Sequence, residues 1–101
     1  MPTGHRVGMQ LRELQDVIAR TYLERDAERG VAVTIAWLAE EVGELARAVR
    51  KGSREEQVLE MGDVLAWLAS LANQLDIDFD EAIAHFANGC PKCGAVPCAC
   101  P

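Results

Sequence analysis

The chain has 101 residues and a mass of 11.0 kDa, which suits one domain and leaves no room for a second domain with its own core. Hydrophobic residues make up 50% and charged residues 26% of the sequence, which excludes a disordered or low-complexity chain. Ten Lys and Arg against sixteen Asp and Glu give a formal net charge of −6, and this argues against binding to duplex nucleic acid.

The sequence also lacks the signals of membrane insertion and secretion. No apolar run approaches the ~20 residues of a membrane span, and Met1 to Arg6 do not include the apolar stretch of a signal peptide. We therefore expect a cytoplasmic protein without a membrane partner. The four cysteines all lie between Cys90 and Cys100, and in a reducing compartment such a cluster holds metal more often than it forms disulfides.

Apolar residues recur at spacings of three and four along the first half of the chain, which is typical of helices with one buried face. They predict a helix from Met9 to Gly30 and a longer one from Val31 to Lys51, and the pattern breaks at Gly52. The expected core stripe of the second helix consists of Ile35, Leu38, Val42, Leu45 and Val49.

Two capping signals predict the remaining helices. Ser53 followed by Glu56 opens a third helix that extends to about Leu75, and Asp78 with Glu81 opens a short fourth helix that ends near Ala87. The core stripe of the third helix is Val58, Met61, Val64 or Leu65, Leu68, Leu71 or Ala72, and Leu75. The sequence therefore predicts an all-α fold, a four-helix bundle over residues 1–88 with a Cys-rich tail over 89–101. Because one copy buries a modest core, we expect a homo-oligomer.

Two pairs of acids carry the chemistry of the predicted hairpin. Glu41 and Glu44 on the second helix, and Glu60 and Asp63 on the third, are spaced i, i+3, so each pair shares a helix face. If the helices fold back about Gly52, Glu41 lies level with Asp63 and Glu44 with Glu60. The same register brings Trp37 level with Trp67, one turn further from the hinge.

Four carboxylates on one patch cannot all remain ionised unaided. Like charges ~4 Å apart repel by ~4 kcal/mol at an effective dielectric of about 20. Their pKa values must rise, or they must bind a hard divalent cation, and oxygen ligands suit Mg²⁺ or Mn²⁺. The alternative is a solvated acidic face. It is weakened because no acid of the four has a basic residue four positions later.

At these positions the sequence resembles the MazG-like all-α nucleotide pyrophosphohydrolases, whose hallmark is an E-x-x-E helix followed by an E-x-x-D helix. The match is Glu41-Val-Gly-Glu44 and Glu60-Met-Gly-Asp63. The resemblance implies a Mg²⁺-dependent hydrolase that cleaves a (d)NTP to the monophosphate and pyrophosphate, working as a homodimer or homotetramer. It also implies that Glu41, Glu44, Glu60 and Asp63 are the metal ligands.

Other residues receive roles from the same resemblance. Glu40 is similar to an extra glutamate of the motif and is our candidate general base, with an exposed surface acid as the alternative. Trp37 and Trp67 stack on the base or fill the core. Asn73 resembles a position near the nucleoside, with a surface or helix-end role as the alternative, and Gln15 is a further candidate for substrate binding.

The cation that meets the triphosphate is not identified by the motif. Many relatives carry Lys and Asn in the fourth helix, whereas this chain has no Lys there. His85, Asn88, Arg47, Lys51 or a residue of a partner subunit could take this role.

The tail has the form of a zinc knuckle followed by a compressed second pair: Cys90-Pro-Lys-Cys93-Gly, then Cys98-Ala-Cys100. Four thiolates close a tetrahedral shell, which predicts structural Zn²⁺ without the open position that catalysis needs. The alternative is a tail that binds metal only adventitiously.

Two rival functions remain open from the sequence. The chain could be a non-catalytic helical interaction module with a vestigial acid patch and a zinc tail for docking a partner. A carboxylate di-iron bundle is disfavoured because neither acidic helix contains the Glu-x-x-His pairs that such centres use.

Overall fold

The computed structural model describes residues 8–101, and in this range it contains helices and no strand. The elements are α1 (Leu11–Arg29), α2 (Val31–Lys51), α3 (Arg54–Gln74), α4 (Phe79–Ile83) and the 3₁₀ turn η1 (Ala84–Phe86). The expected all-helical fold is confirmed. The first seven residues of the expected 1–88 domain, including the segment searched for a signal peptide, lie outside the described residues. No helix within 8–101 is both long and apolar enough to cross a membrane.

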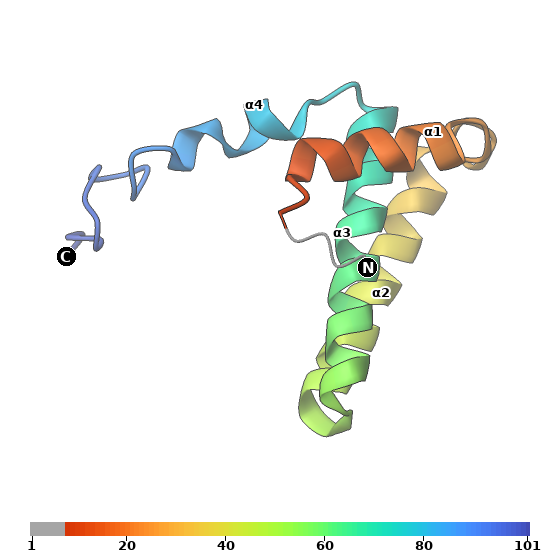
Figure 1. The fold of residues 1–101 in the computed structure, drawn as a ribbon, viewed down its shortest axis with the longest axis horizontal. Helices are drawn as coiled ribbons and strands as arrows, with labels where there is room; N and C mark the ends of the chain where they lie inside the picture. The colour runs from red at the N-terminus through yellow and green to blue at the C-terminus, as the bar shows by residue number, and fades with distance from the viewer. Residues whose placement is uncertain (1–7) are drawn as a thin grey trace.

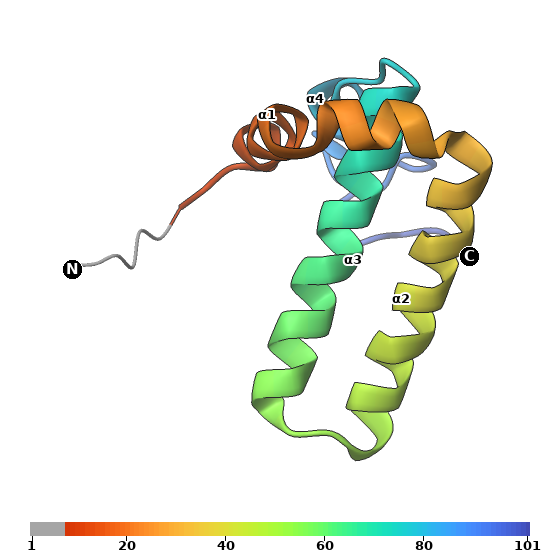
Figure 2. The same ribbon diagram turned by 90° about the vertical axis from the view of Figure 1, so that its right-hand side faces the viewer.

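Helices α2 and α3 form a long antiparallel hairpin (Figures 1 and 2). Its hinge contains the predicted capping box: the Glu56 backbone N–H donates to Ser53 Oγ at 3.1 Å, and the Ser53 N–H donates to Glu56 Oε1 at 2.8 Å. Gly52 is required by close approach, since a Cβ there would lie 2.9 Å from the Cα and the carbonyl oxygen of Ala48. These contacts hold the two arms in one register.

Helix α1 crosses the open end of the hairpin (Figures 1 and 2). Gly30 separates α1 from α2 and has a φ of +85°, a backbone conformation that favours glycine. The core lies where α1 packs on α3 and α4. Its buried members are Ile18, Ala69, Ala72 and Phe79, and Leu14 and Ala66 pack against them.

The apolar stripes of the hairpin are largely exposed, unlike the core stripes expected from the sequence. On α2, Leu38 and Leu45 are half-buried, whereas Ile35, Val42 and Val49 are exposed. The accessible surface is 7387 Å², compared with about 5,600 Å² for a compact monomer of this mass. In a single copy α2 packs mainly against α3, and α1 covers only the open end of the hairpin, so much of each stripe has nothing to pack against.

The fourth helix is shorter than expected. Its α-helical part ends at Ile83, and η1 follows in place of a continuous helix to Ala87. All residues from 80 to 88 are exposed, so no tertiary packing stabilises further helical turns. The chain after η1 leads away from the hairpin and carries the cysteines to the far end of the molecule (Figure 1).

Candidate functional site

Three of the four predicted acids meet across the hairpin. Glu41 on α2 and Glu60 and Asp63 on α3 each place a carboxylate oxygen within 4.8 Å of the other two. Trp37 and Trp67 also lie level, in an edge-to-face pair with ring centroids 5.3 Å apart and an interplanar angle of 74°. The register expected from folding back about Gly52 therefore accounts for the contact of Glu41 with Asp63 and for that of Trp37 with Trp67.

Glu41 is the most perturbed of these acids. Burial raises its pKa, and a hydrogen bond with Glu60 and the nearby charges of Glu60, Asp63 and Glu44 raise it further. Its Oε2 atom is buried and has no hydrogen-bond partner within the described part of the chain. A buried, unpartnered carboxylate oxygen beside two more carboxylates fits a hard cation with oxygen ligands, such as Mg²⁺ or Mn²⁺.

Glu44 lies outside this group of three. It is exposed and lines a neighbouring cavity of about 340 Å³ together with Glu60, one turn of α2 nearer the hinge. Arg47 and Lys51, two of the expected phosphate-binding cations, line the same cavity. Because Glu60 belongs to both the acid group and the cavity, the cations lie beside the acids.

The remaining candidates from the fourth helix and the motif are exposed. Glu40 precedes Glu41 but is not part of the acid group, so its role as a general base stays a prediction. His85 packs its ring against Phe86 with centroids 4.2 Å apart. Neither His85 nor Asn88 lines the cavity that contains Glu60 or the one that contains Asp63.

A second cavity, of about 220 Å³, lies on the α1 side of the acid group. Asp63 forms part of its wall, and Trp37 and Trp67 form another part. The guanidinium carbon of Arg29 lies 4.9 Å from the Trp67 ring centroid and 5.4 Å from that of Trp37. Arg29 also donates to the buried Asp26, with Nη1 2.5 Å from Oδ1.

Sequence reasoning missed Asp26 and Arg29. Their i, i+3 spacing just before Gly30 looks like an ordinary surface ion pair at the end of a helix. The available signal was the spacing of Asp26, four residues after Tyr22, which continues the apolar stripe of Leu14, Ile18 and Tyr22 along the first helix.

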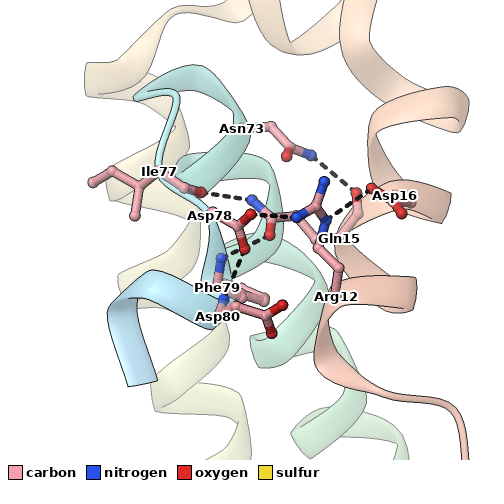
Figure 3. Close-up of polar contacts among 8 residues, drawn as sticks. All are labelled: Arg12, Gln15, Asp16, Asn73, Ile77, Asp78, Phe79 and Asp80. Carbon is pink, nitrogen blue, oxygen red and sulfur yellow. Dashed lines mark hydrogen bonds and ion pairs between the residues drawn. The ribbon is translucent and has the colours of Figure 1, made fainter. Parts of the chain in front are cut away.

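Gln15 and Asn73 lie together at the junction of α1 and α4 (Figure 3). Gln15 Nε2 donates to the carbonyl oxygen of Ile77 at 2.6 Å, and its Oε1 accepts from the Phe79 N–H at 2.9 Å. Asn73 Nδ2 donates to the Gln15 carbonyl oxygen at 3.2 Å. Arg12 pairs with Asp78 beside them. These bonds hold the start of α4 against α1, and substrate contacts of Gln15 and Asn73 stay predictions.

The four cysteines of the tail form one cluster. Their Sγ atoms all lie within 4.8 Å of one another, with Cys90 3.7 Å from Cys100 and 3.6 Å from Cys98, and all four are free thiols. The backbone N–H groups of Ala99 and Cys100 donate to the sulfurs of Cys93 and Cys98, each at 3.3 Å.

The electrostatics of the cluster favour thiolate at its first position. Backbone N–H groups of Cys93 and Lys92 face the Cys90 sulfur and lower its pKa to about 6. The neighbouring thiols of Cys98 and Cys90 raise the pKa of Cys100 to about 11. Four sulfur donors at this separation, with N–H groups directed at them, suit a closed tetrahedral Zn²⁺ site.

Comparison with known proteins identifies the family. The family model of the MazG nucleotide pyrophosphohydrolase domain matches residues 29–92, well over half of the chain. The chain belongs to this family. The matched segment contains all four predicted acids and both tryptophans, whereas Cys93, Cys98 and Cys100 lie beyond it. The chain is also similar to the uncharacterized protein YvdC of Bacillus subtilis (strain 168), with 34% identity over 95 aligned positions that cover 76% of this chain and 90% of the relative.

Proposed function

We propose that this MazG-family chain is a Mg²⁺- or Mn²⁺-dependent nucleoside triphosphate pyrophosphohydrolase. It converts a (d)NTP and water to the (d)NMP and pyrophosphate, as a cytoplasmic house-cleaning enzyme of the nucleotide pool. The observation that supports this most is the group of Glu41, Glu60 and Asp63, with its unpartnered Glu41 oxygen, inside the segment matched by the family model.

The acid group is the place for the metal ion in this proposal. Glu41, Glu60 and Asp63 hold it, and Glu44 joins them by a rotation of its exposed side chain. When bound, the ion neutralises the charge of the triphosphate and orients it for in-line attack. Glu41 is half-buried, and its buried Oε2 atom is shielded from bulk water.

The chain's own groups supply binding and proton transfer. Glu40 accepts a proton from the attacking water, whose oxygen joins the α-phosphorus while the bridging oxygen leaves with pyrophosphate. Arg47 and Lys51 lie on the hinge side of the acids and face the leaving pyrophosphate. Trp37, Trp67 and Arg29 lie on the other side, where the nucleoside binds.

Product analysis tests the proposal. Purified protein is incubated with natural and oxidised nucleoside triphosphates and Mg²⁺, and the products are separated by anion exchange. We expect monophosphate and pyrophosphate in equal amounts, with activity lost in Glu41→Gln and Asp63→Asn and retained in the exposed control Glu55→Gln. Folded protein that releases no pyrophosphate from any triphosphate would instead support the non-catalytic interaction module.

The exposed apolar surface supports the second part of the proposal, a homodimer or homotetramer. A groove along α3 and α4 is lined only by apolar residues, and its exposed members are Leu11, Leu65, Leu68, Leu75, Ala82, Ile77 and Ile83. Continuous apolar surface of this kind marks an interface on a folded chain. A second copy of the chain, with its own unpartnered stripes, is the occupant that we propose.

The tail is the third part of the proposal. Cys90, Cys93, Cys98 and Cys100 bind one structural Zn²⁺, which folds residues 89–101 as a unit separate from the helical domain. The tail lies apart from the acid group (Figure 1), so the zinc takes no part in hydrolysis.

A further inference from the structure

The wall of the cavity beside Asp63 includes a buried acid with an unpartnered oxygen atom. Asp26 is only 1% exposed and forms part of the cavity wall. Its Oδ1 accepts from Arg29, whereas its Oδ2 is buried without a hydrogen-bond partner among residues 8–101. Gln74 approaches Asp26 as well, but its Nε2 donates to the backbone carbonyl at 2.6 Å, and its own Oε1 is also unpartnered.

The unpartnered Oδ2 of Asp26 is costly in a folded protein. A buried polar group that loses its partner costs about 1–3 kcal/mol, and more when it is charged. The protein therefore gains from a ligand that brings N–H groups to this end of the cavity.

The rest of the wall describes the shape of that ligand. The wall contains the aromatic side chains of Trp37, Trp67 and Tyr22, and the planar guanidinium of Arg29 lies over both tryptophan rings. The volume of about 220 Å³ is below that of sites for drug-sized ligands, so it holds a single ring system and not a whole nucleotide. A heteroaromatic base fits these requirements.

The position of the cavity agrees with this assignment. It begins at Asp63 in the acid group and extends along α3 to Ser70, two turns or about 10 Å further along the helix. With the triphosphate at the acids, the base lies toward Asp26.

We propose that Asp26 is a specificity-determining residue that reads the exocyclic amino group of the nucleobase. The inference rests on the proposed function and names its substrate class: triphosphates of adenine, cytosine and guanine, in preference to those of uracil, thymine and hypoxanthine. An amino group offers an N–H donor to the unpartnered Oδ2 of Asp26. The ring N–H of uracil or thymine lies between two carbonyl oxygens and that of hypoxanthine lies beside one, and the carboxylate of Asp26 repels these oxygens.

The test compares substrates that differ only in this group, ATP with ITP and CTP with UTP. We expect kcat/KM for pyrophosphate release to favour the amino member of each pair by about tenfold or more. Asp26→Asn, which presents an amide with both donor and acceptor, brings the ratio close to one. Glu24→Gln, an exposed change on the same helix, keeps the wild-type ratio.

Several outcomes separate the two proposals. A wild-type ratio near one, or an unchanged ratio in folded Asp26→Asn, overturns the assignment of Asp26 and leaves the hydrolase proposal standing. If Asp26→Asn does not fold, the wild-type ratios alone decide. If no triphosphate is cleaved, the hydrolase proposal fails, and the assignment is tested by quenching of Trp37 and Trp67 fluorescence with CTP and UTP, where equal affinity overturns it.

Discussion

At the scale of single residues, the charge of Glu41 opposes folding when no metal is bound. The raised pKa of Glu41, caused first by burial and then by its acidic neighbours, means that its ionised form is less favourable in the folded than in the unfolded chain. We expect Glu41→Gln to unfold at a higher temperature than the wild type in metal-free buffer. Thermal unfolding by circular dichroism measures this, with Glu55→Gln as the exposed control. A lower melting temperature for Glu41→Gln would contradict this interpretation of the site.

The raised pKa of Glu41 also determines how the stability of the metal-free protein depends on pH. Because the folded pKa of Glu41 is raised above its ordinary value of 4.5, the folded chain binds more protons between these two values. The metal-free protein therefore gains stability as the pH falls through the raised pKa toward 4.5. Glu56 acts in the opposite direction, since hydrogen bonds from Ser53 lower its pKa and its stabilisation is lost only below the ordinary value of 4.5. In urea unfolding over a pH series, the free energy of unfolding of the wild type should therefore rise on mild acidification. This rise should be smaller in Glu41→Gln. A free energy of unfolding that declines steadily as the pH falls from neutral would contradict a raised pKa for Glu41.

At the scale of elements, the hinge between α2 and α3 determines whether the acids meet. Ser53→Ala removes the side chain that caps α3, and loss of such a cap costs about 1 kcal/mol. We expect this loss in urea unfolding, while Ser53→Asp, which can still accept from the Glu56 N–H, stays close to the wild type. Equal destabilisation by both changes would show that the cap is not responsible.

Prediction from sequence succeeds where local rules are sufficient. The capping signal at Ser53 and a two-residue turn set the register of the hairpin, and with it the meeting of Glu41 with Asp63 and of Trp37 with Trp67. The place of Asp26 depends on how α1 crosses the hairpin, which no local rule determines. The expected core stripes fail for a related reason, since periodicity identifies an apolar face but not the partner that covers it.

At the scale of the whole molecule, the exposed apolar groove predicts self-association. Light scattering coupled to size exclusion should give a mass that is a multiple of 11.0 kDa. Leu68→Lys places a charge in the groove and should lower that mass, whereas Leu59→Lys, exposed on the same helix outside the groove, serves as the control. A wild-type mass of one chain, or an unchanged mass in Leu68→Lys, would refute this interface.

The tail should behave as a separate unit of the molecule. We expect one zinc ion per chain by elemental analysis, and none in Cys93→Ser purified in the same way, because three thiolates leave the shell open. Chelation should leave the helical circular dichroism signal nearly unchanged, since the tail contributes no α-helix. A collapse of that signal on chelation would show that the zinc supports the helical domain as well.

Calorimetric titration with Mg²⁺ tests most directly whether the hairpin is a metal site. We predict saturable binding of Mg²⁺ to the wild type and its loss in Asp63→Asn, because Asp63 belongs to the acid group. Glu55→Gln should bind Mg²⁺ as the wild type does, because Glu55 lies outside that group. If the folded wild type does not bind Mg²⁺, or if Asp63→Asn binds it equally well, the hairpin is not the proposed metal site.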